Sequence, residues 1–379
     1  MFRLSAFMRE LFQPAAAAPR RAPAGPVVIW NLIRRCNLAC RHCYSISADK
    51  DFAGELSTAD IRTVMADLRG FGVPALILSG GEPLLRPDIF EIARDAKAMG
   101  FYAGLSTNGT LIDEAMADRI AAAGLDYVGI SIDGIGPVHD RFRGQEGAFG
   151  RSVAGLKLCR DRGVKVGLRF TMTEDNHRHL PDVLALMDDE GIDRFYLSHL
   201  NYAGRGNRNK GEDARRLTTR RAMDLLFETC RTRLESGRPC EIVTGNNDAD
   251  GPYFLGWLRR RYPMHADRLE ASLRRWGGNA SGVAVANIDN LGWVHPDTMW
   301  WHERLGNVRE RPFSEIWSDR SGPLMAGLAA RPRAVGGRCA GCRWLALCNG
   351  NSRVRAERVF GDRWAEDPGC YLTDREIAP

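Results

Sequence analysis

Residues 36–44 read CNLACRHCY and place Cys36, Cys40 and Cys43 in a C-x3-C-x2-C spacing. They follow directly on the apolar run 27–32 (VVIWNL), which is typical of a buried strand. Thiolates are soft ligands and a cubane 4Fe–4S cluster takes four of them, so three on one loop leave one iron open. A zinc site or a reduced structural cysteine pair is the simpler alternative, but the third cysteine favours the iron–sulfur interpretation.

This stretch resembles the signature of the radical S-adenosylmethionine (SAM) enzymes. In that superfamily the open iron binds the amino and carboxylate groups of SAM, and an injected electron cleaves SAM to methionine and a 5′-deoxyadenosyl radical. The resemblance implies that Cys36, Cys40 and Cys43 hold the SAM-binding cluster. It assigns no side chain as a catalytic acid or base.

The composition is that of an ordinary globular protein rich in cysteine. With 44% hydrophobic and 26% charged residues, the 379 residues are enough for one large domain and a smaller module. The formal charge of +6 is too small to indicate nucleic acid binding, but it suits an anionic small molecule. Ten cysteines without a secretory segment favour metal ligation in a reducing compartment, so we expect a cytoplasmic protein with no stable membrane insertion.

Three segments are expected along the chain. Residues 1–24 combine a short amphipathic helix with a Pro/Ala-rich run. We interpret them as an N-terminal arm and linker, with a weak membrane-surface helix as the alternative. Residues 25–235 are expected to form the main domain, and residues 236–379 a linker and a cysteine-rich domain.

From Val27 onward, apolar runs typical of strands alternate with amphipathic helices. Such alternation requires a parallel sheet covered by helices. Six units make an open, partial (β/α)6 TIM-like barrel, which matches the radical SAM core fold, so we expect an α/β fold with a smaller C-terminal extension. The expected strands are 27–32, 75–79, 102–107, 127–132, 165–171 and 194–200, and the expected helices begin at 57 or 58 and then cover 87–99, 113–123, 149–162, 180–190 and 220–234.

The first polar motif follows the second strand, at the edge where barrel enzymes place their active groups. Residues 79–83 read SGGEP. Paired glycines let a ligand approach the backbone closely, although a simple tight turn has the same needs. The motif resembles the one that contacts the amino group of SAM, and this implies SAM contacts by Gly80, Gly81 and Glu82.

Two more motifs, STNG at 106–109 and SIDG at 131–134, end the third and fourth strands. Each is also explained by turn chemistry alone. Their shared position at successive strand ends favours polar contacts with the ribose and methionine parts of SAM. The side chains assigned to these contacts are Ser106, Asn108, Ser131 and Asp133.

Two arginines are candidates for binding the carboxylate of SAM. Arg143 lies in the run 139–144 (HDRFRG), which resembles the segment after SIDG in the SPASM branch of the superfamily. It is the better candidate, because a guanidinium can grip a carboxylate with two hydrogen bonds. Arg169 lies inside the fifth strand, where a charged residue needs a partner.

A second group of four cysteines lies near the C-terminus and can fill a closed zinc site or a second 4Fe–4S cluster. The preceding run 292–297 (GWVHPD) resembles the lead-in to the SPASM or twitch extension, which favours the cluster. Asp297 and Ser352 stand where a full SPASM domain has cysteines of its other auxiliary cluster, so we expect one auxiliary cluster only. The four cysteines are Cys339, Cys342, Cys348 and Cys370.

The resemblance extends along most of the chain to one branch, the heme d1 biosynthesis proteins of the NirJ type. Residues 243–251 (VTGNNDADG), 295–317 and 366–371 (EDPGCY) carry it together with the opening stretch. It implies an iron tetrapyrrole substrate, 12,18-didecarboxysiroheme, whose two propionates are removed or converted through the 5′-deoxyadenosyl radical. An electron donor such as flavodoxin or ferredoxin is implied as well.

Substrate contacts are expected where the chain leaves the sixth strand. Residues 201–221 are glycine-rich and basic, and although a solvated loop is the simpler interpretation, basic side chains there could meet substrate carboxylates. His199 could also approach the substrate iron. The residues named as substrate contacts are His199, Tyr202, Arg205 and Arg208, and Lys210, Trp257, Trp293, Trp300, Trp301 and His302 are further candidates.

Three other functions stay open at this point. The first is a sibling tetrapyrrole enzyme, which decarboxylates iron coproporphyrin or removes acetates in the alternative heme pathway. The second is a SPASM peptide maturase, which would usually keep more auxiliary-cluster cysteines. The third is an iron–sulfur electron carrier or zinc-ribbon module, which has no use for a six-strand core or the SGGEP motif.

The two cysteine groups predict two separable clusters. Substitution of Cys36, Cys40 and Cys43 by Ala should abolish 5′-deoxyadenosine formation, while the group around Cys339 still holds iron. Because each cluster holds four iron atoms, the iron content of anaerobically purified protein should fall by about half. Iron content unaffected by the triple substitution would contradict this ligand assignment.

Overall fold

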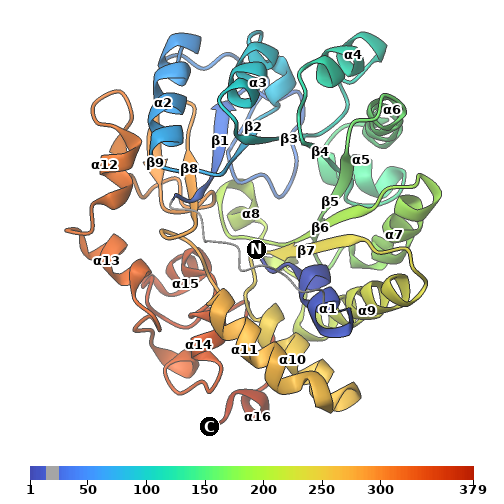
Figure 1. Ribbon diagram of the computed structural model, residues 1–379, viewed down its shortest axis with the longest axis vertical. Coiled ribbons are helices and arrows are strands. Elements are labelled where there is room, and N and C mark those ends of the chain that lie inside the picture. The colour runs from blue at the N-terminus through green and yellow to red at the C-terminus, as the bar shows by residue number, and fades with distance from the viewer. Residues whose placement is uncertain (14–24) are drawn as a thin grey trace.

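The computed structural model describes residues 1–13 and 25–379, and the predicted linker at 14–24 lies outside the described residues. Within the described part, one sheet of ten strands has the order β10-β9-β8-β1-β2-β3-β4-β5-β6-β7. The eight neighbouring strands from β8 to β7 all pair in parallel, whereas β9 and β10 are antiparallel additions. Figure 1 shows the sheet curving around an interior with helices on its outer side.

The six predicted barrel strands are confirmed, with ends that differ by at most one residue. Each lies beside the next in the order of the chain, so every connection is a helical crossover between parallel neighbours. The strands are β1 Val27–Ile33, β2 Ala75–Gly80, β3 Tyr102–Thr107, β4 Tyr127–Ser131, β5 Val166–Met172 and β6 Arg194–His199.

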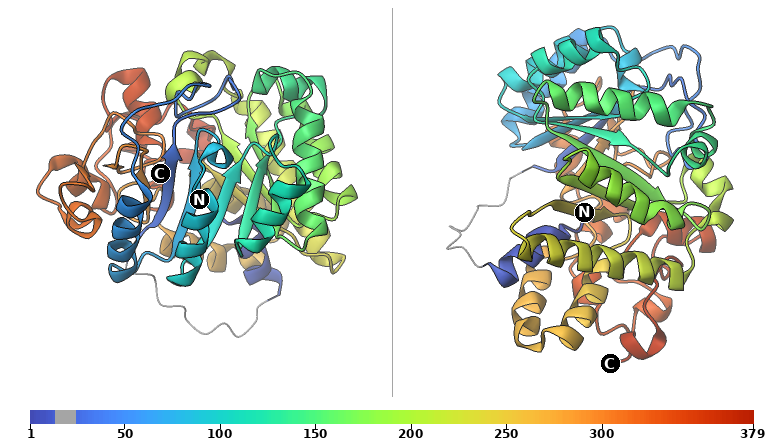
Figure 2. Two further views of the ribbon diagram at one scale, coloured as in Figure 1. Left: turned by 90° about the horizontal axis from the view of Figure 1, so that it is seen from above. Right: turned by 90° about the vertical axis from the view of Figure 1, so that its right-hand side faces the viewer.

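The predicted helices cover the outer face of these strands (Figures 1 and 2). The first of them shows why they form: Ser57 and Asp60 make a reciprocal capping box at its start. Its buried residues recur at helical spacing, Ile61, Val64 and Met65 among them. The predicted helices are α2 Thr58–Gly70, α3 Ile89–Ala98, α4 Glu114–Ala122, α6 Ala148–Asp161, α7 Leu180–Asp189 and α9 Arg216–Glu235. The short helices α5 Pro137–Arg143 and α8 Gly204–Arg208 are not expected from the sequence, and α8 lies against the cysteine loop and not on the outer face.

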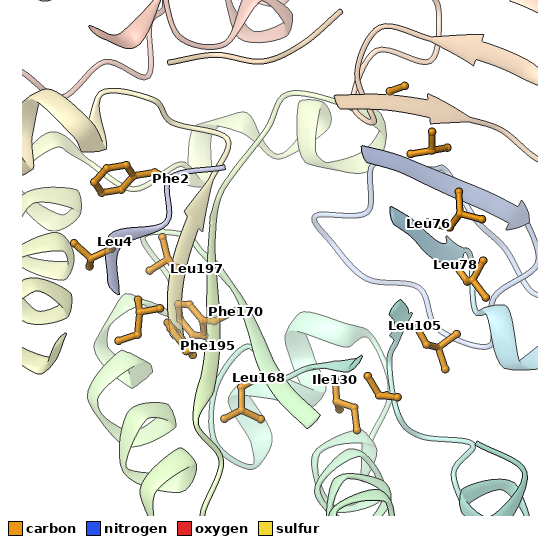
Figure 3. Packing of buried hydrophobic residues seen from close by; sticks show 14 of the residues in the cluster. Phe2, Leu4, Leu76, Leu78, Leu105, Ile130, Leu168, Phe170, Phe195 and Leu197 are labelled. Atoms are coloured by element: carbon orange, nitrogen blue, oxygen red, sulfur yellow. The ribbon is translucent and has the colours of Figure 1, made fainter. Parts of the chain in front are cut away.

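Alternation along the strands separates a packed face from a functional face, because successive side chains point to opposite sides. Large apolar side chains on alternate positions are buried under the helices, and Figure 3 shows them along neighbouring strands. The positions between them carry polar residues that line a cavity inside the barrel. The labelled apolar residues are Leu76, Leu78, Leu105, Ile130, Leu168, Phe170, Phe195 and Leu197.

The segment expected as a C-terminal extension contributes two strands to the barrel sheet. β7 (Glu241–Gly245) pairs with β6, and β8 (Val285–Ile288) pairs with β1. The expected count of six strands therefore omitted one strand at each edge. In the described structure β7 and β8 stand at opposite sides of β1–β6 and do not pair with each other, so the barrel stays open.

The remaining C-terminal elements lie on the open side of the barrel (Figure 1). Strand β9 (Trp293–His295) folds back on β8. None of the described helices is long and apolar enough to cross a membrane. The other elements are β10 Gly306–Asn307 and the helices α10 Asp250–Arg261, α11 Ala266–Trp276, α12 Phe313–Ser318, α13 Pro323–Ala329, α14 Leu345–Cys348, α15 Arg353–Phe360 and α16 Asp374–Ile377.

The N-terminal helix α1 (Leu4–Phe12) packs against the edge strand β7 and against helices α9 and α11. Just before the helix, Phe2 exchanges two backbone hydrogen bonds with Thr244, at 2.7 and 2.8 Å. Leu4 and Met8 are buried in this contact. The helix therefore covers an edge that would otherwise expose unpaired backbone groups.

This packing predicts a stability cost for removing a buried side chain of α1. Leu4→Ala should lower the free energy of unfolding by about 2–5 kcal/mol, because Leu4 is fully buried. Arg9→Ala on the exposed face of the same helix is the matched control and should change it by less than about 0.5 kcal/mol. Denaturant unfolding monitored by circular dichroism measures both, and equal stability of the two variants would argue against the contact.

Candidate active site

The cysteine loop follows β1 and brings the three thiols together. Cys36 and Cys40 are buried, and they pack with Cys43 and Leu38 in one small cluster. Burial raises the pKa of Cys36 to about 12, so this thiol stays protonated at neutral pH unless a metal replaces the proton. Three soft ligands on one loop, facing a cavity, fit a cluster with one open iron.

The glycine pair after β2 packs directly against the chain that enters this loop. A β-carbon on Gly80 would overlap the carbonyl oxygen of Ile33, and one on Gly81 would overlap that of Arg35. Instead, the Gly81 N–H donates to Ile33 O at 2.7 Å. The sequence suggested that the glycines admit a ligand, and the structure shows that they also admit the neighbouring backbone.

A cavity of about 150 Å³ opens beside the three cysteines. Its wall is built from the inward-facing residues of the strands, near their carboxyl ends, which is where barrel enzymes bind their substrates. The inward residues include Ser79 of β2, Tyr196 and Ser198 of β6, and Thr171 of β5. The predicted SAM contacts that line it are Gly80, Gly81, Ser106, Asn108, Ser131, Arg143 and Arg169.

Glu82 lies outside the cavity lining and ties two strand ends together. Its fully buried carboxylate accepts hydrogen bonds from the Thr107 hydroxyl at 2.7 Å and the Asn108 N–H at 2.8 Å. It also accepts from the Leu84 N–H at 3.1 Å. Burial raises the pKa of Glu82 to about 7 in spite of these donors. The geometry gives Glu82 a structural role, and its contact with SAM stays a prediction.

Asp133 and Arg143 form a buried ion pair beside the cysteine loop. Asp133 also accepts a hydrogen bond from the Thr171 N–H at 2.6 Å and lies outside the cavity lining. Arg143 lines the cavity, and its Nη1 lies 3.7 Å from the Cys40 sulfur. A guanidinium in this position stabilises negative charge on the sulfur, so Arg143 already has two partners within the protein.

Arg169 lines the cavity without an ion-pair partner among the described residues. Its Nη1 donates to the Ser106 hydroxyl at 2.7 Å, and its guanidinium lies 5.0 Å from the centre of the Tyr196 ring. Among the described residues it has no carboxylate within ion-pair distance, whereas Arg143 has Asp133. These contacts favour Arg169 as the candidate for a SAM carboxylate, whereas the sequence favoured Arg143, and both contacts stay predictions.

The four predicted substrate contacts lie in different surroundings. His199 and Arg205 line the cavity. Arg205 donates two hydrogen bonds to carbonyl oxygens of the cysteine loop, from Nε to Cys40 O at 2.6 Å and from Nη1 to Ser47 O at 2.8 Å. Tyr202 donates to Asp213 at 2.9 Å and lies outside the lining, and Arg208 is exposed outside it.

The further candidates also lie outside the cavity lining. Trp257 and Trp300 are buried in the apolar core, where large rings are most often found. Instead, the lining contains residues that the sequence did not single out. Tyr196 and Ser198 occupy alternate positions of β6 that face the cavity. The alternation of side chains along this predicted strand could have identified them as lining residues. The lining also includes His42, Asn201, Asn246 and Met299.

The four C-terminal cysteines surround a separate small cavity of about 20 Å³. The rest of its wall is largely apolar, with Ala249, Leu345, Leu372 and Ile377. Burial raises the pKa of all four thiols, Cys370 to about 11. Four convergent sulfurs with an apolar wall fit a closed site with no position left for substrate.

The two positions that depart from the full SPASM pattern have hydrogen-bonding roles of their own. Asp297 accepts from the Ser281 hydroxyl and, at 2.8 Å, from the Met299 N–H. Ser352 caps α15 by accepting from the Arg355 N–H at 3.3 Å. The side-chain oxygens of Asp297 and Ser352 therefore accept hydrogen bonds within the protein, at positions where a full SPASM domain has cysteines.

The family model of the radical SAM superfamily matches residues 30–187. Over 378 residues the chain is 55% identical to the pre-heme d1 synthase of Dinoroseobacter shibae, which covers 99% of this chain and 93% of that protein. It is 47% identical over 355 residues to the Fe-coproporphyrin III synthase of Methanosarcina barkeri, covering 93% and 89%. These relatives span the barrel and the C-terminal cysteines alike.

Among solved structures, SuiB of Streptococcus suis bound to S-adenosylmethionine has the same fold. The two chains superpose with a TM-score of 0.71 at 17% sequence identity, over 92% of this chain and 78% of SuiB. The partial barrel with its C-terminal extension is therefore a known arrangement.

The position of Arg205 predicts that it braces the cluster loop. Arg205→Ala removes two charge-assisted hydrogen bonds and should destabilise the loop by about 2 kcal/mol or more. We expect faster loss of iron and less SAM cleavage, with the Cys339 group unaffected. Arg208→Ala, in the same helix α8 but exposed, is the comparison. Equal iron loss and equal tetrapyrrole affinity in both variants would contradict a bracing role.

Proposed function

The chain belongs to the radical SAM superfamily, in the family that includes the pre-heme d1 synthase of Dinoroseobacter shibae, and we propose that it is an enzyme of heme d1 biosynthesis. The identity of 55% over nearly the whole chain is the observation that carries this proposal. The substrate would be 12,18-didecarboxysiroheme, an iron tetrapyrrole with several carboxylates. Two of its propionate side chains would be removed or converted.

The cofactors are SAM, the 4Fe–4S cluster that binds it and an auxiliary 4Fe–4S cluster. When bound, the first cluster would supply the electron for the reductive cleavage of SAM. Cys36, Cys40 and Cys43 hold that cluster, and Arg143 places a positive charge beside the Cys40 sulfur. Arg169 and the polar strand ends orient SAM in the cavity, and the four C-terminal cysteines hold the auxiliary cluster.

The electron for the first cluster comes from a partner protein. We propose a low-potential donor such as flavodoxin or ferredoxin, and a cytoplasmic location in which the cysteine thiols stay reduced and available for the clusters. The modest positive charge of the chain, +6, suits both an acidic donor and a substrate with several carboxylates.

A second candidate function is that of the relative from Methanosarcina barkeri. The 47% identity to a Fe-coproporphyrin III synthase means that this family contains more than one activity on iron tetrapyrroles. The cavity-lining residues alone do not separate the two, because they bind SAM and the cluster rather than the reacting side chains. The product of the reaction separates them directly.

The test is anaerobic incubation of reconstituted protein with SAM, a strong reductant and 12,18-didecarboxysiroheme, followed by mass spectrometry of the tetrapyrrole. We expect 5′-deoxyadenosine and a product that has lost or converted two propionates. A product with the mass of iron coproporphyrin III would assign the second candidate function. An unchanged tetrapyrrole, with turnover of iron coproporphyrin instead, would place the enzyme in the sibling heme pathway.

A further inference from the structure

Two serines of the cysteine loop are buried beside the sulfur of Cys43. Ser45 is 1% and Ser47 is 2% exposed, although Ile46 between them is 47% exposed. Both serines and Cys43 line the barrel cavity. The two serines therefore belong to the wall of the site, whereas Ile46 belongs to the outer surface of the same loop.

The serine hydroxyls form a short chain that ends at the sulfur. The Ser45 Oγ lies 3.3 Å and the Ser47 Oγ 4.0 Å from the Cys43 Sγ, and the two hydroxyls are hydrogen-bonded to each other. A thiolate that binds a metal has no proton to donate, so the hydroxyls must be the donors. Because the shorter contact with the sulfur is that of Ser45, the chain runs from Ser47 to Ser45 and from Ser45 to Cys43.

An unfavourable backbone conformation accompanies this arrangement. Ile46 has φ of 51°, in the left-handed region. A β-branched residue is a clear outlier there, and such conformations persist only where the surrounding structure holds them. At Ile46 this conformation goes with an outward apolar side chain and with inward hydroxyls on both neighbours. The loop is therefore shaped around the two serines.

Helix α8 supplies the surrounding structure that holds the loop. The Arg205 Nη1 donates to the Ser47 carbonyl oxygen at 2.8 Å. Gly204, with φ of +55°, packs so closely that a β-carbon there would lie 2.5 Å from the carbonyl oxygens of both Cys43 and Tyr44. The segment that carries the hydroxyls is thus fixed on both sides of Ser45.

The three sulfurs of the loop have three different kinds of donor. The Cys36 sulfur accepts from the Leu38 N–H at 3.4 Å, and the Cys40 sulfur lies 3.7 Å from the Arg143 Nη1. The third sulfur has a hydroxyl as its side-chain donor. A hydroxyl is the one of these donors that a substitution removes without a change of charge or of backbone, so its effect can be measured by itself.

We propose that the Ser45 hydroxyl donates to the Cys43 thiolate and raises the reduction potential of the SAM-binding cluster, with Ser47 as the residue that positions it. A reduced cluster carries more negative charge on its sulfurs, so a hydrogen-bond donor stabilises the reduced form more than the oxidised form. A higher potential favours electron transfer from the donor protein. This inference goes beyond the proposed function, since it needs the SAM-binding cluster and no particular tetrapyrrole.

The test is a redox titration of the reconstituted protein in the absence of SAM, followed by electron paramagnetic resonance. The signal of the SAM-binding cluster is the one that changes when SAM is added to a separate sample. In Ser45→Ala the reduction equilibrium of this cluster should be about tenfold less favourable, a shift of about 59 mV for one electron. Ser47→Ala should cause a smaller shift in the same direction, and Ser45→Thr, which keeps the hydroxyl, should resemble wild type.

Two controls separate this effect from a general disturbance of the loop. Ile46→Ala changes the exposed side chain between the two serines and should leave the potential unchanged. The potential of the auxiliary cluster should be the same in all variants, because its cysteines surround a separate cavity.

Deuterium exchange adds a measurement on the wild type. Reduced protein without SAM is frozen after brief exposure to D2O, and pulsed electron–nuclear double resonance detects exchanged deuterons next to the cluster. Hydroxyl protons exchange quickly, so wild type and Ile46→Ala should show a strong deuterium coupling that Ser45→Ala lacks.

Three results would overturn the inference. The first is an equal potential in wild type and Ser45→Ala at equal iron content. The second is a lowered potential in Ser45→Thr despite its hydroxyl, which decides the matter where Ser45→Ala takes up no cluster. The third is the absence of a rapidly exchanging deuteron next to the cluster of the wild type. None of these results bears on the conversion of the tetrapyrrole, so the proposed function is tested separately.

Discussion

The close approach of the Gly80–Gly81 backbone to the chain leaving β1 is the constraint on which the site depends. Any side chain at these positions would push the Ile33 and Arg35 carbonyls away, and the cysteine loop begins directly after them. Glu82 extends the constraint to the next strand, because its carboxylate binds the end of β3. The ends of β1, β2 and β3 are thus held together. This connection fixes the position of the three sulfurs relative to the cavity.

Charge is distributed in this site so that one cation stays available. Burying a charge is costly unless it is paired, and Asp133 and Arg143 satisfy each other beside the cysteine loop. Arg205 is engaged by loop carbonyls. Arg169 keeps only a hydroxyl and an aromatic face as described partners. Arg169 is therefore left without an ion-pair partner among the described residues, and its contact with an anionic group of SAM stays a prediction.

The parts that sequence predicted well depend on local pattern. Strands β1–β6 are apolar runs between amphipathic helices, and the cysteines of each group are close in sequence. The parts it missed depend on distant contacts. Strand β8 has four residues and gains its place from pairing with β1, and Arg205 meets the Cys40 carbonyl from 165 residues away. The ion pair between Asp133 and Arg143 is another contact that the spacing in the sequence does not reveal.

The C-terminal cysteine site and the barrel cavity are lined by neighbouring residues of one segment of the chain. Asn246 lines the barrel cavity and Ala249 lines the C-terminal one, so a single short segment separates the two. Tyr371 directly follows Cys370 in the chain, and its hydroxyl donates to the Asp250 carboxylate. The same carboxylate is hydrogen-bonded to His199. The extension, which also supplies β7 and β8, completes the active-site wall instead of merely being attached to it.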